Sequence, residues 1–457
     1  MVAGGGGGLP GAARMNEVSA QAPRPDGELL PAGVPRQAGA GPEAPAPRGP
    51  RVAGPLGRAV AAFTGRVLGR HQAAVVRIGF GLVWCVYLLR EWPNRRVLYG
   101  DRSPLSLDLA ERLLGDDGAF TVLPWFGGRL WFELVYHLAV LAALAVLLGW
   151  RTRVSTVLFL VTVLSLQNRD IFLGDGGDNV VHLMAVYLVF TRCAEVWSLD
   201  ARRARLGRTG RTGRTGRTGW AKWTGVALWA VLGTALAVCQ FGDFSGRSLT
   251  WTGRAFPYLG WAPLFWGLWT VAGLWWVLGR LRPDGEPRAV LDALATMVHN
   301  CAMLVIAVEV VLIYATAGWY KVQGTRWQDG TALYYPLHLD YFTPWPGLSA
   351  LVGSALLPVF LISYGTVIVQ VAFPFTLLNR RVKNVLLAVM MLEHTGIAVL
   401  LGLPVFSLAM IAADAVFLPT GALLWLAARA SRIGAGRIGA GRIGAGRFGA
   451  GRFRRTP

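Results

Sequence analysis

The stretch Cys301–Tyr320, "CAMLVIAVEVVLIYATAGWY", decides the fold class. Its only charged residue is Glu309. A run of roughly 20 apolar residues is what an α-helix needs to cross the hydrocarbon core of a bilayer. Lys321 stands where the run stops, and a polar, tryptophan-containing loop follows it. The stretch therefore predicts a membrane-spanning helix that carries a cation at its end.

The composition extends this prediction to the whole chain. Of 457 residues, 54% are hydrophobic and only 15% are charged, whereas roughly a quarter of the residues in soluble domains are charged. We therefore expect an all-α, polytopic integral membrane protein with membrane lipids as partners. The net charge of +20 indicates basic cytoplasmic loops in this class, and no nucleic-acid partner is predicted.

About ten apolar runs are long enough to span, or nearly so. The run 289–319 exceeds the usual length, so its helix is predicted to project beyond the hydrocarbon. The predicted spans are 73–89, 130–149, 153–167, 179–197, 221–240, 259–279, 289–319, 352–378, 384–402 and 404–427.

Loop charges predict the orientation of these spans. Arginine-rich connections belong in the cytoplasm, and with ten spans both termini lie on that side. The segments 167–178 and 320–347 are then predicted to lie on the extracytoplasmic side of the cell membrane. The predicted cytoplasmic connections are 151–153, 201–219, 279–288 and 380–383.

The ends of the chain differ in composition from its middle. Residues 1–70 are rich in Gly, Pro, Ala and Arg, and 429–457 form a basic Gly/Arg repeat, so both are predicted to be disordered tails. The transmembrane domain is predicted over 71–428. The four cysteines lie within apolar runs without a CxxC pair, so no metal site is predicted.

A few polar residues stand out as functional candidates. Glu393 and His394 fall inside a predicted span, where ionisable groups are costly and often functional, although a hydrogen-bonded pair that locks helices is the alternative. Asp178 and Asn179 precede another span and are also typical helix caps. Lys321 is either an interfacial anchor or an amine that acts as a base. Arginine could not take the second role, because it does not lose its proton.

Several of these residues lie in stretches that resemble one family. The stretch 314–335, "YATAGWYKVQGTRWQDGTALYY", resembles the signature of the horizontally transferred transmembrane (HTTM) family, the membrane domain shared with vitamin K-dependent gamma-carboxylase. The resemblance covers about residues 70–200 and 289–420 and leaves 201–288 as an insertion with two spans. Further matching stretches are "RIGFGLVW" (77–84), "GDGGDNVVHLMAVYLVF" (174–190), "WSLD" (197–200) and "EHTGIAVLLGLPVFSLAMIAADAVFLP" (393–419).

The resemblance implies chemistry on a reduced quinone similar to menaquinol or vitamin K hydroquinone. In the carboxylase a lysine base deprotonates reduced vitamin K, and the matching residue here is Lys321. A late, buried histidine of the family matches His394, and a histidine-bearing segment falls near Asp178 and Asn179. The chain ends soon after its last apolar run, so the resemblance does not imply peptide carboxylation.

The expected function is that of a carboxylase-like lyase or quinol-dependent enzyme, acting on a quinol or another lipid-soluble substrate at the extracytoplasmic side. The alternative is a non-enzymatic membrane partner or maturation factor for a secreted peptide. A transporter is less favoured, because no inverted repeat is evident. The expected catalytic residues are Lys321 as base with Asp178, Asn179 and His394, and the expected substrate-binding residues are Trp319, Tyr320, Trp327 and Glu393.

Overall fold

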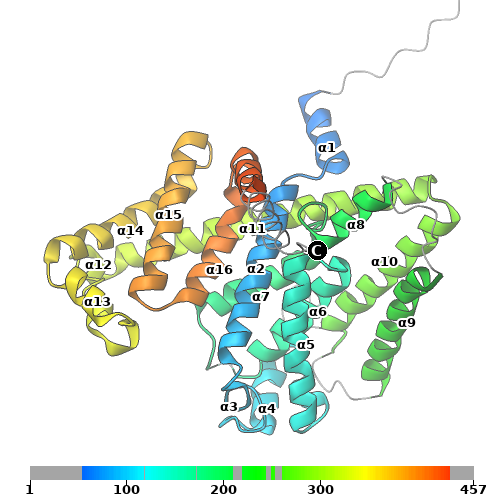
Figure 1. Ribbon diagram of the computed structural model, residues 1–457, viewed down its shortest axis with the longest axis horizontal. Helices are drawn as coiled ribbons and strands as arrows, with labels where there is room; N and C mark the ends of the chain where they lie inside the picture. The colour runs from blue at the N-terminus through cyan, green and yellow to red at the C-terminus, as the bar shows by residue number, and fades with distance from the viewer. Residues whose placement is uncertain are drawn as a thin grey trace, which may run out of the picture. The chain divides into compact units, whose positions relative to one another are not determined.

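The computed structural model describes residues 54–117, 119–170, 172–208, 219–242, 249–252 and 260–432. These residues form α-helices and short 3-10 turns, without a β-strand in those ranges. The predicted all-α fold class is therefore confirmed (Figure 1). Residues 1–53 and 433–457, which make up most of the two predicted tails, lie outside the described residues, and so does the linker 209–218.

The first described helix shows that the N-terminal tail was predicted too long. Helix α1 (Pro55–Gly65) lies within the range 1–70. Its proline occupies the first turn, where the missing backbone N–H has no helical partner in any case. Asn300 holds the end of this helix, because its Nδ2 donates to the carbonyl oxygens of Phe63 and Arg66 at 2.6 and 2.9 Å.

The first long apolar stretch forms α2, which belongs to a bundle of five helices. Helix α2 contacts α5, α7 and α16, and α6 lies between α5 and α7. In Figure 1 the blue α2 and the orange α16 run side by side, so the beginning and the end of the domain meet here. The bundle consists of α2 (Arg70–Glu91), α5 (Arg129–Leu148), α6 (Thr152–Gln167), α7 (Gly176–Phe190) and α16 (Pro404–Asp414).

Two glycines of α2 allow these close contacts. A Cβ atom on Gly81 would lie 2.6 Å from the backbone nitrogen of Leu147 in α5. A Cβ atom on Gly79 would lie 2.5 Å from the Cβ of Ala412 in α16. Since any larger residue would push the helices apart, the "GFG" of α2 fixes its position between two neighbours.

Arg77, at the same end of α2, is fully buried and bonded to backbone carbonyls. Its Nη1 donates to Val146 and Leu147 at 2.5 and 2.9 Å, which caps the C-terminus of α5. Its Nε and Nη2 donate to the carbonyls of Cys193 and Trp197. Helix α7 ends at Phe190, earlier than the predicted 197, because the backbone that follows turns its carbonyls toward this guanidinium.

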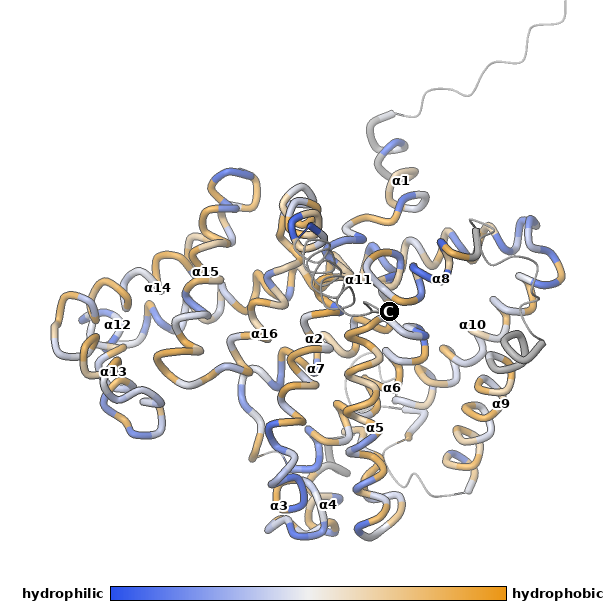
Figure 2. The backbone as a smooth tube through the Cα atoms, viewed as in Figure 1, coloured by the Kyte–Doolittle hydropathy of each residue, from blue (hydrophilic) through white to orange (hydrophobic). Residues whose placement is uncertain are grey.

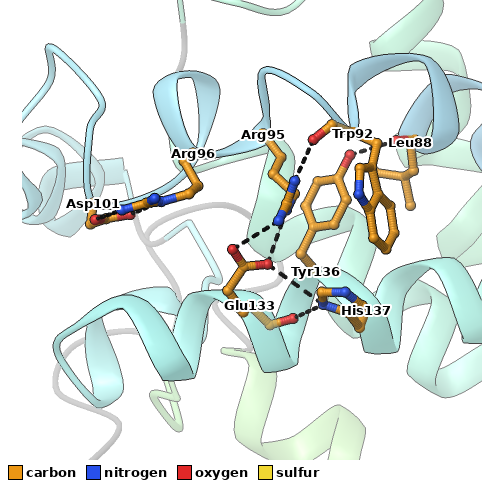
Figure 3. Close-up of polar contacts among 8 residues, drawn as sticks. All are labelled: Leu88, Trp92, Arg95, Arg96, Asp101, Glu133, Tyr136 and His137. Carbon is orange, nitrogen blue, oxygen red and sulfur yellow. Dashed lines mark hydrogen bonds and ion pairs between the residues drawn. The ribbon is translucent and has the colours of Figure 1, made fainter.

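The opposite end of α2 is joined to α5 by a second polar cluster (Figure 3). Arg95 forms a two-pronged ion pair with Glu133, with N–O distances of 2.9 and 3.1 Å. The hydroxyl of Tyr136 donates to the carbonyl of Leu88. The short elements of this region are α3 (Arg95–Leu98), α4 (Leu107–Asp117) and η1 (Leu123–Trp125).

The predicted insertion forms a helical hairpin held by paired tryptophans. Trp229 and Trp269 stack with ring centroids 4.1 Å apart, and each indole N–H donates to the carbonyl of the other residue at 2.9 Å. Gly273 leaves room for the Trp229 ring, 2.8 Å from where a Cβ would stand. The elements of the insertion are α8 (Leu199–Arg208), α9 (Gly219–Phe241) and α10 (Trp261–Leu281).

The remaining helices carry the polar groups discussed below. Helix α11 has 38 residues, about 57 Å at 1.5 Å per residue, and runs across the view of Figure 1 from α10 to α12. The remaining elements are α11 (Glu286–Gln323), α12 (Thr325–Gln328), η2 (Pro336–His338), η3 (Asp340–Phe342), α13 (Pro346–Gly353), α14 (Leu356–Thr376), α15 (Arg380–Leu400), η4 (Ala415–Phe417) and a last helix, Thr420–Arg432.

Six of the described helices are long and apolar enough to cross a membrane: α2, α5, α10, α11, α14 and α15. Figure 2 shows hydrophobic residues along these helices and a hydrophilic α8. Helices α6, α7 and the segment Gly225–Phe241 of α9 are apolar but shorter. A multi-pass membrane protein is therefore supported, whereas the count of about ten spans and the orientation of the termini stay predictions.

One predicted span is not a single straight helix. The run 404–427 consists of the segment Pro404–Phe417 and the helix Thr420–Arg432, bent by 117°. The break falls at Pro419, which cannot donate the backbone hydrogen bond that would continue the helix. Counted as one broken span, this pair brings the candidates in the described part of the chain to seven.

Candidate functional site

Lys321 lies near the C-terminal end of α11 and is partly buried. Its Nζ donates a 2.8 Å hydrogen bond to Oε1 of Gln370 in α14 and lies 5.2 Å from the centre of the Trp327 ring. The Nε2 of Gln370 donates in turn to Oε1 of Glu393 in α15 at 2.7 Å. The structure thus brings together three residues predicted from the sequence, and Gln370 links the amine to the carboxylate.

Close approach of α11 to α14 makes the first of these bonds possible. Gly318 lies one turn before Lys321, and a Cβ on it would stand 2.9 Å from a methyl carbon of Val371 and 3.2 Å from its backbone nitrogen. Val371 follows Gln370 directly in the chain. Because Gly318 has no side chain, the two helices lie near enough for the lysine to reach the amide of α14.

A second polar chain starts from the neighbouring residue of α15. The Nε2 atom of His394 lies 3.1 Å from the hydroxyl oxygen of Tyr314, and that hydroxyl donates to Oδ2 of Asp414 at 3.0 Å. Tyr314 precedes Lys321 by seven residues, which is two turns of α11 and therefore the same face. All three side chains of this chain are at most 2% exposed.

The two chains influence one another electrostatically. Lys321 lies within Coulombic reach of His394, and Glu393 lies within reach of Asp414 and of Tyr314. Helices α11, α14, α15 and α16 therefore share one polar network. We call these six residues, Tyr314, Lys321, Gln370, Glu393, His394 and Asp414, the α11–α16 network.

The predicted aromatic residues divide between this network and the surface. Trp327 contacts the ammonium of Lys321. Trp319 and Tyr320 are 62% and 73% exposed. Their assignment to substrate binding stays a prediction that the geometry does not strengthen.

Asp178 and Asn179 lie at the start of α7, apart from the network. The N-cap is Asp175, and Asp178 completes a capping box by accepting from the Asp175 backbone N–H at 2.9 Å. Asn179 is exposed. The helix-capping interpretation therefore describes Asp178, although Asp175 rather than Asp178 is the N-cap, and the structure places neither residue against Lys321.

The start of α7 nevertheless lies close to the network through one aromatic ring. A Cβ on Gly177 would stand 2.7 Å from the Cα of Phe406, and the Phe406 ring lies edge-on to His394 with centroids 5.5 Å apart. Asp178 also lies within Coulombic reach of Tyr99. The pKa of Tyr99 is raised well above its ordinary value, mainly by burial. The Tyr99 and Tyr87 hydroxyls share a hydrogen bond.

Sequence reasoning missed three members of the network. Gln370, Tyr314 and Asp414 each interrupt a long apolar run, as in "VIVQVAF" (367–373) and "IAADAVF" (411–417). A polar residue in such a run needs a partner inside the membrane. That signal marks each residue singly but does not say which residue it meets.

The fold and the site together define an all-helical, multi-pass membrane protein with a polar network buried among four of its helices. Comparison with family models, with curated proteins and with solved structures finds no match to the chain. The resemblance to the HTTM family therefore stays a prediction.

Proposed function

We propose that this chain is a membrane enzyme in which Lys321 removes a proton from a hydroxyl of a lipid-soluble, quinol-like substrate. The observation that carries the proposal is the setting of the Lys321 amine. Its hydrogen-bond acceptor is the neutral amide of Gln370, and the face of Trp327 lies beside it. An ammonium with neutral neighbours gives up its proton more readily than one paired directly with a carboxylate.

The use of lysine at this position supports the same conclusion. Of the 45 basic residues only Lys222, Lys321 and Lys383 are lysines, and the other 42 are arginines. An interfacial anchor requires only a long cation, which arginine supplies elsewhere in the chain. A base must lose its proton at working pH, and arginine cannot do so.

The chemical step is a proton transfer with a defined balance. The substrate O–H bond breaks, its electron pair stays on oxygen as a quinolate, and a new N–H bond forms at Nζ of Lys321. Gln370 orients the amine, and Glu393 balances the ammonium charge from one side chain further away. The menaquinol-like substrate is the class that the resemblance implies, and the extracytoplasmic location of the site belongs to the proposal.

The step can be followed with a short-tailed reduced menaquinone as the probe. The purified protein in lipid nanodiscs is mixed with the probe without oxygen, and the quinolate is detected by its absorption at longer wavelength than the quinol. We expect the rate of quinolate formation to fall by roughly 10²–10⁴-fold in both Lys321→Arg and Lys321→Met, as for the loss of a general base.

Lys383→Arg is the matched control. Lys383 donates to the carbonyl of Phe417 at 2.6 Å, a bond that an arginine can also make, so its rate should equal that of the original chain. An unchanged rate in Lys321→Arg, at equal protein and equal probe binding, contradicts the base assignment and leaves Lys321 as an anchor. Failure of the original chain to bind the probe contradicts the quinol class.

The exposed segment between α11 and α14 favours the second candidate function, a partner for a secreted peptide. Tyr341 and Trp345 there are 84% and 61% exposed. A peptide could dock on these rings without any proton transfer at Lys321. Replacing both rings with serine would then abolish peptide binding and leave quinolate formation unchanged.

A further inference from the structure

The hydrogen-bonded chain His394–Tyr314–Asp414 can run in either of two directions. A tyrosine hydroxyl carries a single hydrogen. When that hydrogen points to Oδ2 of Asp414, the tyrosine oxygen accepts a hydrogen from Nε2 of His394. When Asp414 instead carries a proton on Oδ2, it donates to Tyr314, and Tyr314 donates to Nε2 of His394. Both arrangements use the same atoms at the observed distances of 3.1 and 3.0 Å.

The two arrangements differ by one proton at the far side of the histidine ring. In the first arrangement His394 is neutral with its hydrogen on Nε2, and Nδ1 is a free acceptor. In the second arrangement His394 is again neutral, but its hydrogen is on Nδ1. Adding a proton at Nδ1 and shifting two hydrogens along the chain therefore converts the first arrangement into the second and leaves Asp414 protonated.

The outer atoms of the chain make no competing hydrogen bond in the described residues. His394 Nδ1 and Asp414 Oδ1 are buried and have no hydrogen-bond partner in the part of the chain that the structure describes. His394 and Asp414 are 2% and 0% exposed. A buried acceptor is normally bonded, and a group that served only to lock helices together would gain nothing from leaving Nδ1 unpaired.

We propose that Tyr314 and Asp414 form, with His394, a proton relay that receives a proton at His394 Nδ1 and delivers it to Asp414. The inference rests on the proposed function, because a quinol has a second hydroxyl whose proton this relay would take while Lys321 takes the first. The substrate O–H bond breaks and an N–H bond forms at Nδ1. The Nε2 hydrogen passes to Tyr314, and the Tyr314 hydrogen passes to Oδ2 of Asp414.

His394 would touch the substrate, whereas Tyr314 and Asp414 act through it. The other charged groups that face the relay are Lys321 from α11 and Glu393 from α15, which sit within Coulombic reach of it. A cation and an anion beside the relay bias proton movement in opposite senses.

The test is a pH titration of the purified protein without any quinol, so that the proton is the probe. Nitrogen-15 NMR of labelled histidine distinguishes the two neutral tautomers from the imidazolium, and only six histidines are present. His394→Gln identifies the His394 signals. Infrared difference spectra report protonation of Asp414, which Asp414→Asn identifies.

We expect His394 to exchange its Nε2–H tautomer for the Nδ1–H tautomer on acidification, at the same midpoint at which Asp414 gains its proton. In Tyr314→Phe the shared midpoint should be lost, because the ring stays in place but the connecting hydroxyl is gone. Thr316→Val is the matched control and should keep the coupled exchange, because the Thr316 hydroxyl on α11 bonds to carbonyls of its own helix in the described part of the chain.

Three results overturn the relay. They are a His394 that keeps one tautomer over the whole pH range of folded protein, a His394 that becomes imidazolium while Asp414 stays ionised, and an exchange that survives in Tyr314→Phe. If Tyr314→Phe does not fold, the titration of the original chain decides alone. Since no quinol is used, the base role of Lys321 stands or falls separately by the rate of quinolate formation.

Discussion

Arg77 and His394 are both buried ionisable residues on apolar helices, yet they are bonded in different ways. Arg77 donates to four backbone carbonyls, contributed by α5 and by the segment that follows α7. His394 bonds through one nitrogen to another side chain, and its second nitrogen has no partner in the described residues. The guanidinium of Arg77 therefore has a backbone acceptor for each of its nitrogens, whereas the imidazole of His394 keeps a free acceptor.

This difference distinguishes polar side chains that stabilise the fold from polar side chains that can serve a function. An unsatisfied buried polar group costs about 1–3 kcal/mol, so a cluster that only stabilises the fold should leave few of them. The cluster at Arg77 fits that expectation. The α11–α16 network instead keeps open atoms on His394 and on Asp414, and five of its six side chains, all but Gln370, can change protonation state.

The helices that carry the two clusters also differ in how tightly they pack. Within the apolar window of each helix, 61% of the residues of α2 are buried but only 17% of those of α15. Helix α2 therefore faces protein on most sides, and α15 is buried along one narrow stripe that includes His394. Substitutions should be far less tolerated on α2 than on α15.

The largest effect is expected from Arg77→Ala. It leaves the carbonyls of Val146, Leu147, Cys193 and Trp197 without their donor, so we expect at least about 3 kcal/mol of lost stability. Size-exclusion chromatography in detergent should show little folded protein. Arg77→Lys keeps the charge but has fewer donors, and it should accumulate to an intermediate level.

Tyr314→Phe is the comparison that can break this argument. It removes a hydroxyl from the α11–α16 network, and hydrogen bonds between membrane helices contribute about 0.6 kcal/mol on average. The variant should therefore accumulate nearly as well as the original chain. Equal losses of folded protein in Tyr314→Phe and Arg77→Ala would show that both clusters are structural.

The next effect compares two glycine-to-alanine substitutions. Gly81→Ala in α2 places a Cβ 2.6 Å from the backbone of Leu147, and overpacking of this kind costs about 1–3 kcal/mol. Gly396→Ala in α15 meets no atom within 4 Å and should be neutral or slightly stabilising, because alanine favours helix. Thermal unfolding in detergent measures both, and a Gly396→Ala as damaging as Gly81→Ala would contradict the difference in packing.

The fold was predictable where the apolar pattern is long and uninterrupted. The runs 73–89, 130–149 and 289–319 correspond to α2, α5 and α11. The errors lie where one residue outweighs the pattern. Hydropathy continues through Pro419, and it does not show that the backbone between Phe190 and Trp197 leaves the helix to bond Arg77.

The candidate site was predictable only in part. Lys321, Trp327 and Glu393 were selected for their chemistry and position, and the structure brings them together. The link through Gln370 could not be predicted, because the two bonds it makes join residues 49 and 23 positions apart. Which helices are neighbours depends on packing devices such as Gly318, whose role is visible only once both helices are in place.

The smallest effect concerns Arg96 and Asp101, a pair outside the candidate spans (Figure 3). Two hydrogen bonds of 3.0 and 2.6 Å join them. They lower the pKa of Asp101 to about 2, chiefly through the hydrogen bond from Arg96. Because this pKa is below the ordinary value, the pair favours the folded state above about pH 4, and that contribution is lost as the pH falls through about 2. Both side chains are partly exposed to solvent, so the contribution is small. Arg96→Gln should raise the pKa of Asp101 toward its ordinary value in an NMR titration and leave the unfolding temperature at pH 7 nearly unchanged. If Arg96→Gln lowered that temperature about as much as Gly81→Ala does, an exposed ion pair would contribute as much stability as close helix packing in this chain. Burial would then no longer distinguish the contribution of the Arg77 cluster from that of exposed polar pairs.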